Sequence, residues 1–108
     1  TIGSSTPDII EYLFSNLIPL YPKIEFGAHL HTSPETWKEK VNAAFKGGCV
    51  RFDGALKGVG GCPMAKDELI GNMPTEKLVD YFMDQKINLD IDKQKFDRAL
   101  TEASRVFL

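Results

Sequence analysis

Apolar residues recur every three or four positions in the first part of this chain, which is the periodicity of an amphipathic helix. Thr6 and Pro7 stand just before them and supply the hydroxyl N-cap and first-turn proline with which helices often begin. Pro19 and Pro22 follow the apolar stripe and predict the end of this helix.

The period then changes from helical to alternating. Residues 23–31 and residues 49–55 alternate between apolar and polar side chains, and each segment therefore predicts a strand. In the first strand, His29 and His31 share one face and Leu30 lies on the other.

Three further helices are marked by their ends. Ser33-Pro34-Glu35 opens a helix between the two strands, and Gly47-Gly48 ends it. Pro74-Thr75 opens the next helix, and Asp92 caps the last one. The resulting order is helix, strand, helix, strand, helix, helix.

A strand, a helix and a second strand in this order predict parallel strands, which are normally covered on both faces. Two parallel strands alone would leave open edges and little core. A complete (β/α)8 TIM barrel needs roughly 250 residues, and this chain has 108. We therefore expect residues 1–108 to be the C-terminal quarter or third of a single barrel domain, with flanking and C-terminal helices. The start at Thr1, without Met, suggests a cut inside a larger protein. The alternative is a small two-stranded α/β domain that folds alone.

Composition excludes several classes of protein. The formal net charge of −2 argues against a nucleic-acid-binding surface. No apolar run approaches the roughly 20 residues that span a bilayer, and no signal peptide is visible. Cys49 and Cys62 form neither a disulfide framework nor a C-x-x-C pair, which favours a reducing cytoplasm.

The strand end His29-Leu30-His31 is the first candidate site. A spacing of two puts both imidazoles on the same face, which in a barrel strand is the interior, near the end where active sites lie. Gly27 precedes them on the same face, and its lack of a side chain leaves space for a bound group beside the histidines. Two neutral imidazoles are suitable partial ligands for a divalent metal. The alternative is a pair of histidines that are only hydrogen-bonded in the strand end.

A glycine-rich loop, residues 58–63, follows the second strand and contains Cys62. Such glycine density serves unusual backbone angles or a mobile lid, and a thiol here could exchange a proton with a substrate. The alternative is a flexible connection with an inert thiol, while Cys49 is interpreted as core. Asn72 offers a carbonyl oxygen to a hard cation, or else serves a turn or helix cap.

Together these features resemble 3-hydroxy-3-methylglutaryl-CoA lyase, a metal-dependent barrel enzyme related to isopropylmalate and homocitrate synthases. The shared features run in the same order along the whole chain: Thr1-Ile2-Gly3, Thr6-Pro7, the H-x-H strand end, the G-x-G-G-C-P loop and Gly71-Asn72. The cysteine loop is the most specific of them, because the other motifs are shared across the superfamily.

The resemblance implies a role for each candidate residue. His29, His31 and Asn72 match the ligands of a Mg²⁺ or Mn²⁺ ion, and His29 or His31 is also expected to assist catalysis. Cys62 matches the catalytic loop cysteine, and Thr1 matches a threonine that lines the substrate site. An Asp ligand and a catalytic Arg of the family would lie before Thr1.

Some positions depart from the family pattern. The family usually reads His-Cys-His-Asp, where this chain has Leu30 and Thr32 at the second and fourth positions. Leu30 exchanges one buried apolar side chain for another, whereas Thr32 removes an acid that could orient the site. Met64 replaces an aromatic residue, and the segment from Cys62 to Asn72 is one residue longer than usual.

The resemblance further implies cleavage of 3-hydroxy-3-methylglutaryl-CoA to acetyl-CoA and acetoacetate, as in leucine degradation and ketone-body formation. It implies an acyl-CoA substrate, the rest of the barrel as partner, a homo-oligomer, and a cytoplasmic location or the mitochondrial matrix in a eukaryote. The isolated piece is expected to be inactive. The alternatives are a Claisen-type acyl-CoA synthase or oxo-acid lyase of the same superfamily, and a non-catalytic barrel remnant.

Overall fold

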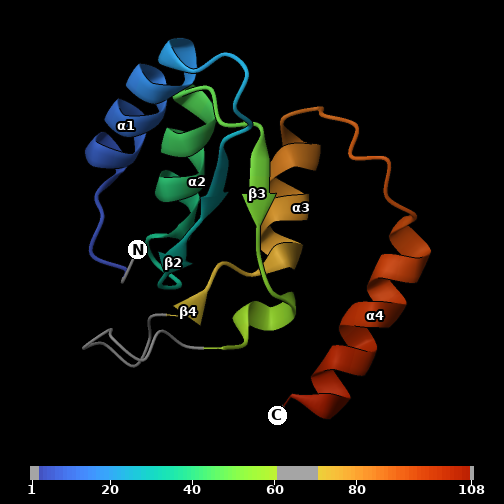
Figure 1. The fold of residues 1–108 in the computed structure, drawn as a ribbon. Coiled ribbons are helices and arrows are strands. Elements are labelled where there is room, and N and C mark those ends of the chain that lie inside the picture. Colours follow the sequence, from blue (N-terminus) through green and yellow to red (C-terminus); the bar gives the residue numbers. More distant parts are fainter. Residues whose placement is uncertain (1–2, 61–70, 108) are drawn as a thin grey trace.

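The computed structural model describes residues 3–60 and 71–107 of the chain, and these form an α/β fold (Figure 1). Among the described residues, its four α-helices and its short strands follow one another in this order: α1 Pro7–Leu20, β1 Gly27–His29, β2 His31–Thr32, α2 Trp37–Lys46, β3 Arg51–Asp53, the 3-10 helix η1 Leu56–Gly58, β4 Gly71–Asn72, α3 Thr75–Asp84 and α4 Lys93–Val106.

The predicted helix ends are largely confirmed. The side chain of Thr6 accepts a hydrogen bond from the backbone N–H of Ile9 at 3.3 Å, and that of Asp92 accepts one from Lys95 at 3.1 Å. One expectation was wrong, because Pro19 lies inside the last turn of α1 and does not end it. A proline so close to the end removes a single helical hydrogen bond, and α1 continues to Leu20.

The two predicted strands pair in parallel, as expected. In β1 and β3, Ala28 stands opposite Phe52 and His29 opposite Asp53. Both strands are shorter than the predicted ranges 23–31 and 49–55. The first loses its start because residues 21–24 form a turn, in which Ile24 N–H donates to the Tyr21 carbonyl. The second starts later because Cys49 N–H still closes the preceding helix on Ala44.

A second pair of strands was not predicted. After a break at Leu30, β2 pairs antiparallel with β4, so that His31 stands opposite Asn72 and Thr32 opposite Gly71. The Leu30 carbonyl accepts a hydrogen bond from Met73 N–H at 3.1 Å, which extends the contact between the two segments beyond β2 and β4. The break turns the strand end toward β4 and places two candidate site residues side by side.

Helix α2 also begins later than expected. Residues 33–36 form a turn in which the Thr36 hydroxyl accepts from Ser33 N–H at 3.1 Å, and α2 starts at Trp37. The C-terminal end at Gly47 and Gly48 is confirmed, since Gly48 adopts a φ of +102° that favours glycine.

The core lies between the strands and the helices α1, α2 and α3. Ala28 and Leu30 are buried on the helix side, while Gly27 and His29 are exposed on the other side, as alternation predicted. Phe52 packs its ring 5.0 Å from that of Phe82. Helix α4 stands apart from this body and contacts η1 (Figure 1). No helix in the described part of the chain has the length and apolar character needed to cross a bilayer.

Replacing the N-cap Thr6 by alanine should lower the free energy of unfolding by about 1 kcal/mol, because the Ile9 N–H loses its acceptor. Urea unfolding followed by circular dichroism measures this. Thr101→Ala is the matched control, since its exposed hydroxyl donates to the Asp97 carbonyl inside α4 and caps no helix start. An equal loss in both variants would contradict the capping role.

Candidate functional site

Both histidines lie where the parallel strands end. His29 is the last residue of β1, and His31 is the first of β2. Their rings are 5.3 Å apart between centres and meet edge to face at 71°. Two imidazoles on one ion, with metal–nitrogen distances of about 2.0–2.1 Å, have ring centres about 5 Å apart. The spacing of this pair is therefore compatible with a shared ion.

Asn72 joins the histidines through the pairing of β4 with β2. Its amide nitrogen donates to the Val59 carbonyl at 2.9 Å, and this bond fixes which way the amide faces. Its amide oxygen is buried and finds no hydrogen-bond partner among the described residues. A buried acceptor without a partner costs stability, and a cation would satisfy it. The residues present therefore fit a hard divalent ion with mixed nitrogen and oxygen ligands.

The first part of the glycine-rich loop packs directly on Asn72. Gly58 and Gly60 have φ angles of +67° and +86°. A Cβ at Gly58 would lie 2.7 Å from the Asn72 carbonyl oxygen, and one at Gly60 would lie 2.9 Å from the Asn72 amide nitrogen. Both angle and space require glycine here, which confirms the expected use of these residues for unusual backbone geometry.

Two predicted site residues, Cys62 and Thr1, lie outside the described residues, as does Met64. The structure therefore brings together His29, His31 and Asn72 and leaves the roles of the other two as predictions. Among the described residues, no group of three or more His, Cys, Asp or Glu side chains is placed to hold a metal. An ion at this site would need further ligands beyond the two imidazoles and the amide.

The protonation of His31 suits ligation. Burial lowers the pKa of His31, and the neighbouring His29 lowers it further. The imidazole is therefore mainly neutral at pH 7, and a metal ligand must be neutral imidazole. Cys49 behaves differently, because burial raises the pKa of its thiol, which donates to the Arg51 carbonyl at 3.1 Å. The interpretation of Cys49 as core is confirmed.

The face that carries His29 is polar. Arg51 lies 3.2 Å from Glu25 and 3.8 Å from Asp53, and the three side chains are more than half exposed. The arginine also occupies the space expected beside Gly27, where a Cβ would lie 3.3 Å from the Arg51 side chain. The open space predicted there is therefore partly filled.

Two departures from the family pattern can be located. Leu30 is buried, as predicted for the helix-facing side. Thr32 is buried as well, and its hydroxyl donates to the Met73 sulfur at 3.7 Å. An acidic residue in the place of Thr32 would be buried beside Met73.

A cleft of about 300 Å³ borders Asn72, and sequence reasoning missed it. Its other lining residues come from the turn after β2, from η1 and from the start of α3: Thr32, Ser33, Pro34, Lys57, Gly58, Gly71, Pro74, Glu76 and Lys77. Lys57 and Lys77 bring two positive side chains to this cleft, and Glu76 brings one negative side chain. The Glu76 carboxylate accepts a hydrogen bond from the backbone N–H of Lys57 at 2.9 Å. The cleft forms because β4 pairs with β2, and no local sequence pattern predicts that pairing.

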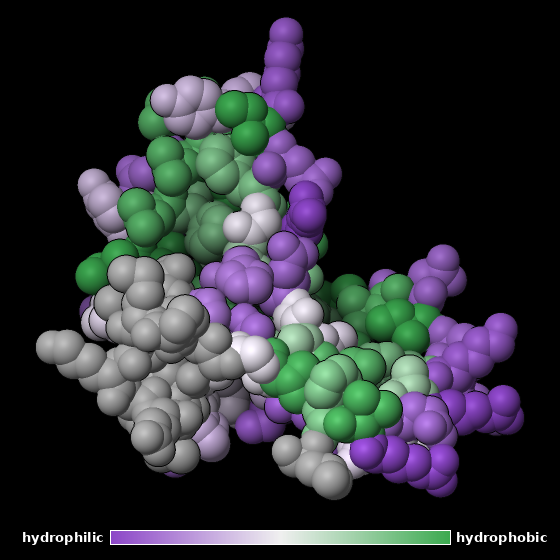
Figure 2. Space-filling view, turned by 60° about the horizontal axis from the view of Figure 1, so that its bottom comes forward, coloured by the Kyte–Doolittle hydropathy of each residue, from purple (hydrophilic) through white to green (hydrophobic). Residues whose placement is uncertain are grey.

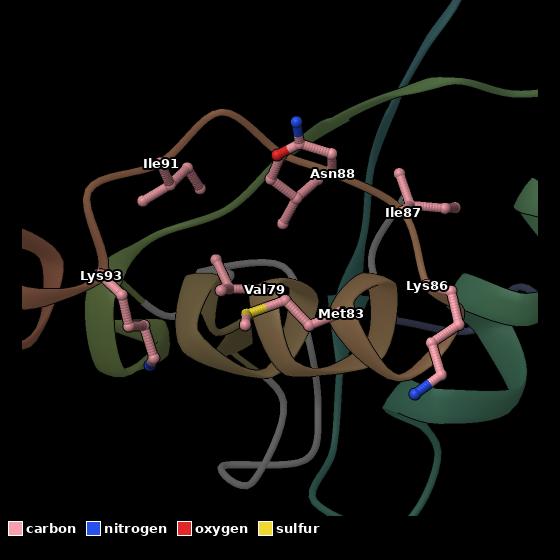
Figure 3. A pocket seen from close by; sticks show the side chains of 8 residues that line it. Val79, Met83, Lys86, Ile87, Asn88, Ile91 and Lys93 are labelled. Atoms are coloured by element: carbon pink, nitrogen blue, oxygen red, sulfur yellow. The ribbon is translucent and has the colours of Figure 1, made fainter.

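A second cleft, of about 370 Å³, lies between α3 and the segment that leads to α4. Figure 3 shows Val79 and Met83 on α3 facing the segment that carries Ile87, Asn88 and Ile91. None of the candidate site residues lines this cleft. It is therefore separate from the histidine pair.

Known proteins resemble this chain in both sequence and structure, although no family model matches it. A Bacillus subtilis hydroxymethylglutaryl-CoA lyase, YngG, is 33% identical over 96 residues, which cover 86% of this chain and 31% of that protein. The (R)-citramalyl-CoA lyase of Chloroflexus aurantiacus is 33% identical over 92 residues, or 85% of this chain and 29% of that protein.

Solved structures agree with these relatives. An HMG-CoA lyase from Acinetobacter baumannii, in complex with coenzyme A and 3-methylmalate, matches with a TM-score of 0.76 at 33% identity, covering 97% of this chain and 33% of that one. The HMG-CoA lyase from Brucella melitensis matches with a TM-score of 0.74 at 26% identity, covering 97% and 38%. The chain spans about one third of the length of the curated relatives it matches. Over most of its length, this chain is a homologue of part of the hydroxymethylglutaryl-CoA and citramalyl-CoA lyases.

Proposed function

We propose that this chain is the C-terminal portion of a (β/α)8-barrel lyase that cleaves 3-hydroxy-3-methylglutaryl-CoA to acetyl-CoA and acetoacetate. The observation that carries the proposal is that His29 and His31 meet the buried Asn72 oxygen, which has no hydrogen-bond partner among the described residues, in a chain related to these lyases. The full-length enzyme is this chain joined to the rest of its barrel.

The exposed apolar surface supports a larger barrel. Figure 2 shows hydrophobic side chains gathered beside hydrophilic ones on the face that bears the strand ends. Large apolar residues lie exposed on α1, before β1 and β3 and along the C-terminal segments: Ile9, Tyr12, Leu13, Leu17, Leu20, Tyr21, Ile24, Val50, Met83, Ile91, Val106 and Phe107. Large contiguous apolar patches are rare on monomeric proteins and usually mark a surface that another part of the protein covers. Neighbouring barrel elements would cover part of it.

The proposed chemistry is a retro-Claisen cleavage. A base takes the proton of the tertiary hydroxyl, the carbon–carbon bond breaks, and the acetyl-CoA enolate that leaves is reprotonated at carbon. His29, His31 and Asn72 would hold a Mg²⁺ or Mn²⁺ ion, which when bound would polarise the substrate oxygens. Cys62 takes part in the proton transfers, His29 assists, and Thr1 lines the substrate site.

The surroundings of the site suit an acyl-CoA. The cleft beside Asn72 carries Lys57 and Lys77, and positive side chains favour an anionic ligand. Lys77 also lies 5.3 Å from the centre of the Trp37 ring. From the family resemblance alone, we further propose a homo-oligomer that acts in the cytoplasm, or in the mitochondrial matrix in a eukaryote, in leucine degradation.

A second candidate is cleavage of citramalyl-CoA, because the Chloroflexus relative is as similar as the Bacillus one. A synthase of the same superfamily would also keep His29, His31 and Asn72 but would not need Cys62. Incubating the full-length enzyme separately with 3-hydroxy-3-methylglutaryl-CoA, with citramalyl-CoA, and with acetyl-CoA plus a 2-oxo acid distinguishes these reactions. A barrel remnant without catalysis would turn over none of them.

The isolated 108-residue chain should show negligible lyase activity and weak affinity for Mn²⁺. The reason is that two imidazoles and one amide leave about half of an octahedral coordination sphere to water. Isothermal titration calorimetry with Mn²⁺ measures the affinity. Micromolar binding by the isolated chain would contradict this expectation.

A further inference from the structure

A buried lysine lies directly behind the strand end that carries the second histidine. Lys40 is in the middle of α2 and is only 3% exposed. Its side-chain nitrogen donates to the Gly3 carbonyl at 2.9 Å and lies 3.4 Å from the His31 carbonyl, to which it also donates. Lysine is among the residues least often buried completely, so this position calls for a reason.

We propose that Lys40 is a positioning residue that ties the main chain at His31 to the segment at Gly3 and thereby sets the direction of the His31 imidazole. The inference rests on the proposed function in so far as that direction serves a metal ion.

The two carbonyls that accept from Lys40 belong to different segments of the chain. Gly3 precedes α1, and His31 belongs to β2, so a single side chain from α2 holds together segments that are far apart in the sequence. Gly3 also has a φ of +83°, a conformation that turns its carbonyl in a way few other residues allow. Because Thr1 is two residues before Gly3, the same contact links the strand end to the segment predicted to line the substrate site.

The role does not depend on whether the amine is charged. Burial lowers the pKa of Lys40, while the nearby Glu39 raises it. The ammonium has three N–H donors and the neutral amine has two, so either form can serve both carbonyls. A methionine of similar length would fill the space, but it would leave both partly buried carbonyls without this donor.

The His31 main chain also pairs with β4, opposite Asn72. A shift of β2 would therefore change the distance from the His31 ring to the Asn72 oxygen as well as to His29. Groups that orient metal ligands from behind typically change metal affinity by about 10- to 100-fold when they are removed. We expect an effect of that size at Lys40.

The test compares Lys40→Met with Lys38→Met in the full-length enzyme. Lys38 is exposed on the same helix and is the matched control. Free Mn²⁺ is measured by electron paramagnetic resonance, and crystal structures of both variants and of the unsubstituted enzyme are solved without metal. Lys40→Met should bind Mn²⁺ about 10-fold more weakly and should show a displaced His31 and Gly3, while Lys38→Met changes neither.

Two results would overturn the inference: an unmoved His31 in the Lys40→Met structure, or unchanged Mn²⁺ affinity in a variant whose parent binds the ion. If the unsubstituted enzyme binds no Mn²⁺ at His31, the proposed metal site fails, and the crystal structures alone decide the role of Lys40. If Lys40→Met does not fold, Lys40→Arg retains donors, and recovery of folding together with near-normal His31 geometry supports the role. A folded Lys40→Arg with a displaced His31 and unchanged Mn²⁺ affinity contradicts it.

Discussion

Replacing Cys62 by serine in the full-length enzyme is expected to lower turnover of 3-hydroxy-3-methylglutaryl-CoA by about 10²- to 10⁴-fold. A free thiol has a pKa of about 8.5 and can exchange protons near neutral pH, whereas a serine hydroxyl is far less acidic. The substitution changes one atom, so substrate binding should be largely kept. The loss should therefore fall mainly on kcat.

Acetyl-CoA release under single-turnover conditions measures this effect on the chemical step. Cys49→Ala is the control: the Cys49 thiol is buried and bonded to the Arg51 carbonyl, so its loss should lower stability without changing turnover per folded molecule. Near-normal turnover by Cys62→Ser would exclude Cys62 from proton transfer. The lyase reaction would then use another group for proton transfer.

The helices of this chain could be predicted from local chemistry. Thr6 and Asp92 accept hydrogen bonds from the first turns they precede, and the glycines after α2 end it, because caps depend on residues within one turn of each other. The order and parallel pairing of β1 and β3 followed from the same local reading together with the rule for strand connections.

The strand lengths and the second pair of strands could not be predicted in this way. Alternation extends through residues 23–31, but the Leu30 carbonyl just after β1 accepts a hydrogen bond from Met73 N–H, and Met73 is distant in the sequence. Gly71 and Asn72 are too few to give a periodic signal, although they form β4. Non-local pairing of this kind is decided by tertiary contacts and not by propensity.

The candidate site could be predicted only in part, for the same reason. The common face of His29 and His31 follows from a spacing of two, which strand geometry fixes. The contact of Asn72 with Val59 and the crowding of Gly58 and Gly60 against Asn72 depend on β4 reaching β2. The sequence therefore identified the residue types of the site, and the fold supplied the reason that two of the loop glycines are needed.

Replacing His31 by alanine in the full-length enzyme is expected to weaken Mn²⁺ binding by at least about 10- to 100-fold, the size seen even for groups that act behind the ligands. Turnover should fall with it. The strand pairing of His31 with Asn72 uses main-chain groups, so alanine keeps β2 and β4 together. Calorimetric titration with Mn²⁺ measures the affinity, and thermal unfolding without metal tests that the fold is unchanged.

A double-mutant cycle with Asn72→Ala separates a shared ion from ordinary packing. If His31 and Asn72 hold one ion, their effects on the free energy of unfolding should be coupled. The coupling should be about 0.5–3 kcal/mol with Mn²⁺ present and much smaller with EDTA in its place. Arg51→Ala paired with His31→Ala is the control, because Arg51 is exposed and pairs with Glu25. Equal coupling of His31 and Asn72 with and without metal would mean that the two residues only pack against each other. The Asn72 oxygen, which has no hydrogen-bond partner in the described part of the chain, would then need another partner, such as a bound water. The metal assignment would be lost even if the lyase reaction itself were observed.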